Sequence, residues 1–146
     1  DMIFLMAGVL GVAAAMTKSG AGDLIGNAIL SVLGGHPSSL AVMFLFSTVC
    51  IIMTTLMSNS ATSNILYTVG ATVCLAGGWD PRGIMLIIAI ANIISLGFPS
   101  GAAETALIYA AGNYKVSQVA KFTIPYIIIA IITISLSANF FYPIYG

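Results

Sequence analysis

SNSATSN, at residues 58–64, is a dense polar cluster between two apolar segments, Leu40–Met57 and Ile65–Ala76. If the cluster were a loop outside a membrane, each flanking segment would have to be a complete span. The second segment has 12 residues, roughly 18 Å of helix, which is too short for a hydrocarbon core of ~30 Å. We therefore predict a re-entrant helical hairpin over residues 40–78, with a non-helical tip near Asn59 at mid-depth.

The composition of the whole chain indicates a membrane environment. Hydrophobic residues make up 60% of the 146 residues and charged residues 5%, whereas a soluble domain carries roughly 25% charged residues. A net charge of zero argues against a nucleic-acid partner. We predict an all-α polytopic membrane protein surrounded by lipid. Because the chain begins at Asp1 without an initiator Met, we expect a fragment of a longer protein.

Four further segments complete the predicted order of elements. Each is an apolar or amphipathic stretch bounded by charged or turn-forming residues. They are a transmembrane helix at 1–17, short for a span; an interfacial arm helix at 21–33; a discontinuous transmembrane helix at 83–112, interrupted at Pro99-Ser100-Gly101; and a final transmembrane helix at 122–142, with Pro125 in its first turns.

The two polar interruptions carry the functional hypothesis. Non-helical backbone at membrane depth is tolerated only where it is buried in protein or lines a water-filled cavity. Helix-end N–H groups there attract anions, while carbonyl and hydroxyl oxygens coordinate small cations such as Na⁺. A packing interpretation stays open, because Ser, Asn and Gly inside apolar helices also join neighbouring helices, and a Pro-Ser-Gly run can be only a kink.

The remaining reactive side chains indicate little other chemistry. Glu104 is the only acid deep in an apolar stretch. It is expected either to carry a proton or Na⁺, or to be stabilised by the N–H groups at a helix start. His36 is predicted to be interfacial, and Cys50 and Cys74 to be apolar fillers with free thiols. The chain shows no enzyme signature, and we predict that it is not an enzyme.

Ser58-Asn59-Ser60 resembles the Ser-Asn-Thr signature of the divalent-anion/sodium symporters, a family of the ion transporter superfamily whose members carry dicarboxylates, citrate or sulfate. Residues 5–20 are similar to the family's helix ahead of the arm, and residues 98–116 to its broken helix and exit loop. The resemblance covers nearly the whole chain and corresponds to the family's C-terminal repeat.

Two departures from the family pattern concern the substrate. Ser60 stands where the signature has Thr, which keeps the hydroxyl and loses a methyl group. The segment Ala102-Ala103-Glu104-Thr105 stands where the family often has Thr-Pro-Pro-Asn. These departures leave the substrate class open.

The resemblance implies one of two inverted repeats, each with a hairpin and a broken helix, in the plasma (inner) membrane. The implied partners are Na⁺, a small anionic solute, the missing N-terminal repeat of the same protein and a second copy in a homodimer; Na⁺ is the coupling ion and no other cofactor is implied. The carried-over sodium site comprises Thr54, Ser58, Asn59 and Gly101, and the carried-over substrate site comprises Asn59, Ser60, Ala103, Glu104 and Thr105.

We therefore expect a secondary active transporter that performs sodium-coupled symport of a small anion such as a dicarboxylate, citrate or sulfate. Two alternatives stay open. One is an ion or proton antiporter of related architecture that uses Glu104, and the other is a non-transporting membrane assembly subunit in which the polar breaks only pack helices. Stimulation of solute flux by Na⁺ separates the first function from both alternatives.

Overall fold

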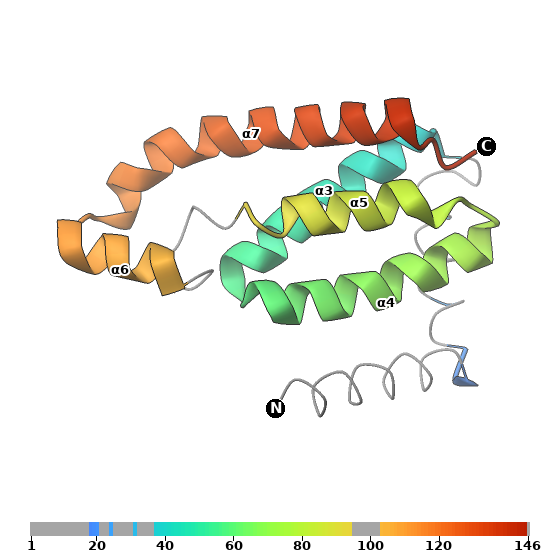
Figure 1. Ribbon diagram of the computed structural model, residues 1–146, viewed down its shortest axis with the longest axis horizontal. Helices are drawn as coiled ribbons and strands as arrows, with labels where there is room; N and C mark the ends of the chain where they lie inside the picture. The colour runs from blue at the N-terminus through green and yellow to red at the C-terminus, as the bar shows by residue number, and fades with distance from the viewer. Residues whose placement is uncertain (1–17, 21–23, 25–30, 32–36, 95–102, 146) are drawn as a thin grey trace.

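The computed structural model describes residues 18–20, 24, 31, 37–94 and 103–145. These residues form helices and connecting turns, with no strand among them. This confirms the all-helical class predicted from the sequence. The helices are α3 (Ser39–Leu56), α4 (Asn59–Gly77), α5 (Pro81–Ala91), α6 (Ala103–Gly112) and α7 (Val116–Phe141), as Figure 1 shows.

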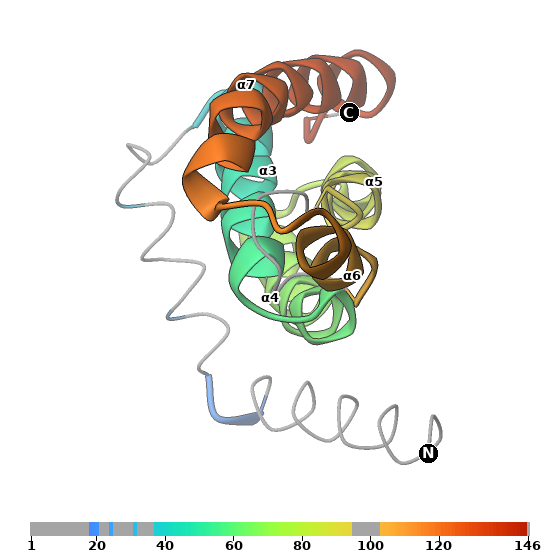
Figure 2. The ribbon, with the colours of Figure 1, turned by 90° about the vertical axis from the view of Figure 1, so that its left-hand side faces the viewer.

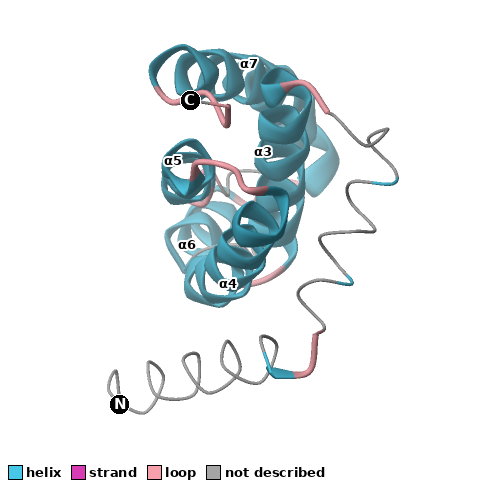
Figure 3. Cartoon of the chain, turned by 90° about the vertical axis from the view of Figure 1, so that its right-hand side faces the viewer, coloured by secondary structure: helices cyan, strands magenta, loops and turns pink. Residues whose placement is uncertain are grey.

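The packing places α3 and α5 at the centre of the described bundle. Helix α3 contacts α4, α5 and α7, and α5 also contacts α4 and α7. Seen end-on, α3 and α5 lie between α7 on one side and α4 on the other (Figures 2 and 3). Of the described helices, α3 and α7 are long and apolar enough to cross a membrane.

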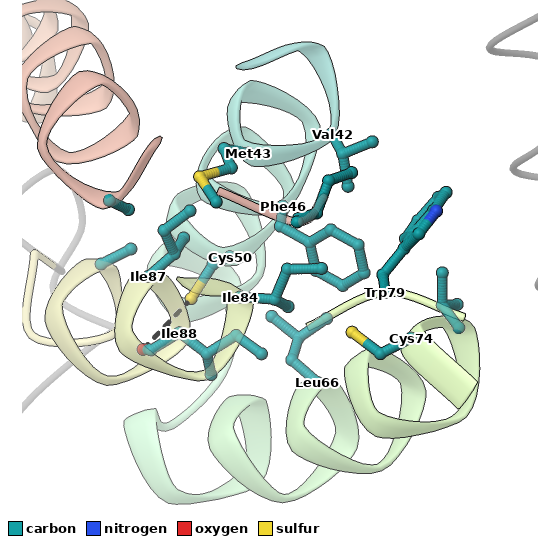
Figure 4. Close-up of a cluster of buried hydrophobic side chains, with 14 of the residues drawn as sticks. Val42, Met43, Phe46, Cys50, Leu66, Cys74, Trp79, Ile84, Ile87 and Ile88 are labelled. Carbon is teal, nitrogen blue, oxygen red and sulfur yellow. Dashed lines mark hydrogen bonds between the residues drawn. The ribbon is translucent and has the colours of Figure 1, made fainter. Parts of the chain in front are cut away.

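A cluster of buried apolar side chains fills the space where α3, α4 and α5 meet (Figure 4). Met43 and Cys50 of α3 and Ile84 and Ile88 of α5 are completely buried. Leu66 of α4 closes the cluster from the other side. This apolar contact holds α5 against both legs of the hairpin, because closely packed side chains gain van der Waals attraction, which drives helix association within a membrane.

Local capping explains where the helices begin and end. The Ser38 and Ser58 hydroxyls each accept a hydrogen bond of 3.3 Å from the backbone N–H three residues later, which starts α3 and α4. Asp80 accepts from the backbone N–H of Arg82 at 2.9 Å, and Pro81 occupies the first position of α5. Gly78 ends α4 in the left-handed conformation, with φ of 65°.

The C-terminal tail ties the open end of the hairpin together. Tyr145 Oη donates to the Pro37 carbonyl at 2.9 Å, and the backbone N–H of Ile144 donates to Ser39 Oγ at 3.1 Å. The backbone N–H of Asp80 donates to the Ile144 carbonyl at 3.0 Å. We call this end, comprising residues 37–39, 79–83 and 142–145, the base of the hairpin.

The opposite end, where α3 turns into α4, differs from the prediction. Only Met57 and Ser58 separate the two helices, and residues 59–64 of the polar cluster form the first turns of α4. The turn lies beside Asn59, where the tip was predicted, but it is shorter than the polar cluster, because Ser58 acts as an N-cap and the polar residues after it continue as helix. The return leg has 19 residues, roughly 28 Å of helix. The length of α4 therefore does not by itself require re-entry, and re-entry stays a prediction.

The segment after the hairpin also ends earlier than expected. Helix α5 ends at Ala91, whereas the predicted apolar leg continued to Phe98. The backbone N–H groups of Ile93 and Ile94 bond to carbonyls three residues back, which tightens the chain into a turn. The predicted break at residues 99–101 lies outside the described residues, and helix resumes at Ala103.

The last helix begins earlier than expected. Helix α7 starts at Val116 rather than Phe122, because the side chain of Gln118 accepts a hydrogen bond of 3.1 Å from the backbone N–H of Lys115. Pro125 consequently lies in the third turn rather than the first or second. The predicted helix at 1–17, most of the arm at 21–33 and His36 lie outside the described residues; within the arm, Leu24 and Ser31 are helical.

Candidate functional site

Thr54 is the central side chain at the turn between α3 and α4. It is completely buried near the end of α3. Its Oγ1 lies 2.7 Å from Asn59 Oδ1 and 2.9 Å from the backbone carbonyl oxygen of Asn92. A hydroxyl carries one proton, so Thr54 donates to one of these two acceptors at a time. Three oxygen atoms from three helix ends therefore meet here.

Asn92 brings the end of α5 into the same cluster. Its side-chain Nδ2 donates to Ser63 Oγ on α4 at 2.7 Å, while its backbone carbonyl accepts from Thr54 on α3. Its Oδ1 is buried and has no hydrogen-bond partner among the described residues. The carbonyl ends of a helix carry partial negative charge, so this end of α5 favours a cation.

Two further hydroxyls belong to the same part of α4. Thr62 is completely buried, and its Oγ1 has no hydrogen-bond partner within the described part of the chain. Ser60 is exposed, and the hydroxyl of Ser58 is engaged as the cap of α4. We call the set Thr54, Asn59, Thr62, Ser63 and Asn92 the tip cluster.

The donor set of the tip cluster fits an alkali cation better than a transition metal. It offers hydroxyl, amide and carbonyl oxygens, which are ligands for hard cations. No group of three or more His, Cys, Asp or Glu side chains that could hold a metal ion occurs in the described ranges. The free thiols of Cys50 and Cys74 are buried in the apolar core, and Cys50 Sγ lies 3.8 Å from the Ile88 carbonyl oxygen.

The structure brings together part of the predicted site. Thr54 and Asn59 are in hydrogen-bond contact, and Ser58 precedes Asn59 at the turn. Gly101 lies outside the described residues. The predicted substrate residues Ala103, Glu104 and Thr105 form the first turn of α6, where Thr105 is buried.

Asn92 was not among the site residues predicted from the sequence. The available signal was a carboxamide inside the otherwise apolar segment 83–98. Its meaning depends on the contact between α5 and the hairpin, which joins Thr54 to a residue 38 positions later. Ser63 and Thr62 were part of the polar cluster in the sequence, but no individual role was predicted for them.

The described helices are apolar, and their polar oxygen atoms gather where the end of α5 meets the turn of the hairpin. Residues 1–145 match the family described as the sodium:sulfate symporter transmembrane region. The chain belongs to this family, which confirms the resemblance drawn from the Ser-Asn-Ser segment. It is accordingly an integral membrane segment, and its family is one of transporters and not of enzymes.

Named relatives extend the comparison. The chain is 29% identical over 120 residues to the Sodium-dependent high-affinity dicarboxylate transporter 3 of Caenorhabditis elegans, covering 82% of this chain and 21% of that protein. It is 30% identical over 132 residues to the Probable sodium/sulfate cotransporter 3 of Chlamydomonas reinhardtii, covering 86% of this chain and 14% of that protein. An uncharacterised transporter of Synechocystis is 29% identical over 129 residues, covering 88% of this chain and 21% of that protein. The chain thus spans 14–21% of the length of these curated relatives.

Proposed function

We propose that the full-length protein containing this chain is a secondary active transporter that couples Na⁺ to the uptake of a small anion, such as a dicarboxylate, citrate or sulfate. The proposal is carried by three oxygen atoms that lie close together. Thr54 Oγ1 is 2.7 Å from Asn59 Oδ1 and 2.9 Å from the Asn92 carbonyl oxygen. These oxygens belong to the turn of the hairpin and to the negative end of α5, where a cation is stabilised.

Thr54, Ser58, Asn59 and Gly101 are the proposed sodium residues. Thr54 and Asn59 contribute side-chain oxygens, and Ser58 holds the start of α4 in place by capping it. Na⁺ would supply a positive charge beside which an anion is stabilised, because the attraction between opposite charges strengthens in a low-dielectric surrounding.

The proposed anion site comprises Asn59, Ser60, Ala103, Glu104 and Thr105. Residues 59 and 60 begin α4, and residues 103–105 begin α6. The first N–H groups of a helix have no intrahelical acceptor and favour negative charge. Glu104 is the second residue of α6, a position at which an ionised carboxylate is stabilised by the helix dipole.

The wider architecture is proposed from the family. We propose an N-terminal repeat of inverted topology, a homodimer, a plasma (inner) membrane location and entry of the hairpin into the membrane without crossing it. The relatives named for sodium-dependent dicarboxylate transport and sodium/sulfate cotransport support a sodium-coupled anion carrier.

Uptake by the purified full-length protein in proteoliposomes tests this function. Radiolabelled succinate, citrate and sulfate are offered under an inward Na⁺ gradient, an equal K⁺ gradient, or a pH gradient without Na⁺. We expect the Na⁺ gradient alone to drive accumulation of at least one of these anions. Accumulation driven by the pH gradient without Na⁺ would replace Na⁺ with H⁺ as the coupling ion, and no uptake under any gradient would contradict the proposed transport of these anions.

A further inference from the structure

Asn92 joins the end of α5 to both legs of the hairpin. Its backbone carbonyl accepts a hydrogen bond of 2.9 Å from Thr54 on α3. Its side-chain amide donates a hydrogen bond of 2.7 Å to Ser63 on α4. One residue therefore holds the relative positions of three helices at the tip cluster.

The single proton of Thr54 makes the Asn92 carbonyl important. Asn59 Oδ1 and the Asn92 carbonyl oxygen compete for that proton. For Thr54 Oγ1 and Asn59 Oδ1 to face a cation together, the proton must point away from Asn59. The Asn92 carbonyl is the acceptor available for this, and among the described residues Thr54 is its donor.

Two bonds fix the position of that carbonyl. The backbone N–H of Asn92 donates to the Ile88 carbonyl at 3.1 Å, which continues the last turn of α5. The Asn92 side chain is anchored to Ser63 at its Nδ2, while its Oδ1 is buried without a partner in the described ranges. A buried carboxamide satisfied on one side only lowers stability, and such groups are expected mainly where function requires them.

We infer that Asn92 is a positioning residue of the sodium site. Its carbonyl accepts the hydrogen bond from the Thr54 hydroxyl, and its side-chain bond to Ser63 holds that carbonyl in place. Thr54 Oγ1 and Asn59 Oδ1 can then face Na⁺ together. The inference rests on the proposed function. It requires that Na⁺ affinity depends on the bond between Asn92 and Ser63, whereas the affinity for the anion at saturating Na⁺ does not.

The test compares variants of the full-length protein in proteoliposomes. Asn92→Ala and Ser63→Ala remove the same hydrogen bond from its two ends. Each should raise the Na⁺ concentration for half-maximal uptake about three- to tenfold, the worth of one neutral hydrogen bond. The KM for the anion at saturating Na⁺ should change little. The double variant should shift no further than either single variant, because the bond is already lost.

Two further variants separate positioning from general damage. Ser63→Thr keeps the hydroxyl and should keep the Na⁺ requirement close to that of the wild type. Ser47→Ala removes a different buried bond, the 2.8 Å contact with Ser135 that joins α3 to α7, and should leave the Na⁺ requirement unchanged. This control removes the same chemical group, a serine hydroxyl that bonds between helices; Ser47 is completely buried, whereas Ser63 is partly buried.

The outcomes distinguish this inference from the proposed function. If wild-type uptake does not depend on Na⁺, the proposed function is wrong and the inference falls with it. If wild-type uptake depends on Na⁺ but Ser63→Ala leaves the Na⁺ requirement unchanged, the inference alone is overturned. An equal shift in Ser47→Ala would also overturn it, because any lost bond between helices would then suffice. If Asn92→Ala does not fold, Ser63→Ala and Ser63→Thr still decide the question.

Discussion

The two ends of the α3–α4 hairpin are built on different principles. At the base, Tyr145, Ile144 and Asp80 form hydrogen bonds of 2.9–3.1 Å that join the C-terminal tail to both neighbouring segments. At the tip, the single hydroxyl proton of Thr54 is within hydrogen-bond reach of two acceptors, Asn59 Oδ1 and the Asn92 carbonyl oxygen. The buried oxygens Thr62 Oγ1 and Asn92 Oδ1 have no hydrogen-bond partner within the described ranges.

The polar groups at the base are hydrogen-bonded to one another, whereas several polar groups at the tip are not. Satisfied polar networks rigidify a fold, whereas buried oxygens without donors lower its stability. The base therefore fixes where the hairpin starts and ends, whereas the oxygens at the tip are the ones that would face Na⁺ under the proposed function. Substitutions at the tip should change ion dependence, and substitutions at the base should change stability.

The largest effect is expected from Asn59→Ala at the tip. This variant removes the amide that contacts Thr54 and is proposed to face both ion and substrate. Uptake by the full-length protein should fall to background while the protein still elutes as a folded species in size-exclusion chromatography. Asn64→Ala, the same substitution five residues further along α4, is the control and should keep Na⁺-driven uptake. If Asn59→Ala changed neither uptake nor its Na⁺ dependence, the result would support the interpretation that the polar cluster only packs helices together.

At the base, Gly83→Ala should have the largest effect on stability. A Cβ at Gly83 would overlap the backbone carbonyl oxygen of Tyr142 and the end of the Met43 side chain. The overlap with backbone cannot be relieved by a side-chain rotation, so we expect a loss of about 1–3 kcal/mol, measured by thermal unfolding in detergent.

Gly70→Ala is the matched control for Gly83→Ala. A Cβ at Gly70 would lie 3.1 Å from Ile84 Cγ2 and 3.3 Å from Ile88 Cδ1, which are side-chain atoms that need to shift by only a few tenths of an ångström. Alanine also favours a helix interior over glycine by about 1 kcal/mol, which offsets part of the crowding. If Gly83→Ala unfolds no earlier than Gly70→Ala, the close approach of α5 to the tail is wrong.

A smaller effect is expected from Tyr145→Phe. The variant loses the 2.9 Å hydrogen bond to the Pro37 carbonyl but keeps the ring that stands edge-on to Trp79 with centroids 6.4 Å apart. Stability should fall by about 1 kcal/mol, as for one neutral hydrogen bond, with no change in the Na⁺ requirement. Tyr126→Phe, at an exposed position on α7, should change neither. A changed Na⁺ requirement in Tyr145→Phe would contradict the separation of base and tip.

The smallest effect is expected from Asp80→Asn. Hydrogen bonds from the Arg82 side chain and backbone hold the pKa of the Asp80 carboxyl below its usual range. The stabilisation from the ionised carboxylate is therefore complete above about pH 4, the usual value, and is lost as the pH falls through the lowered pKa. The effect should be slight, because Arg82 is 70% exposed and exposed ion pairs contribute little.

Unfolding midpoints measured from pH 7 to pH 3 check the Asp80 prediction. Asparagine keeps an oxygen that can cap α5, so any difference from the wild type reflects the lost charge. The difference should shrink as the pH falls below about 4, because the carboxyl of the unfolded chain takes up its proton there and that of the folded chain does so at lower pH. A difference that grows with acidity would contradict the stated direction of the pKa shift.

Much of the helix order was predictable, but the state of the polar cluster was not. Serine and asparagine either unwind a helix or cap its start, and the residue pattern alone does not distinguish these outcomes. The structure shows that Ser58 caps α4 and that Asn59 already belongs to the helix. The early end of α5 was missed for a related reason, since Ile93 and Ile94 look as apolar as the helix before them.

The amino-acid sequence by itself determined the membrane class, the helical segments and the family, because these follow from composition, apolar run lengths and a short ordered set of residues. Thr54 and Asn59 were candidate ion ligands only through the resemblance to the family, which carried the sodium site over to them. Tertiary structure alone decided that Asn92 completes the tip cluster and that the C-terminal tail closes the base. Both depend on contacts between residues 38 to 108 positions apart, and such contacts arise only when buried apolar faces pack the helices together.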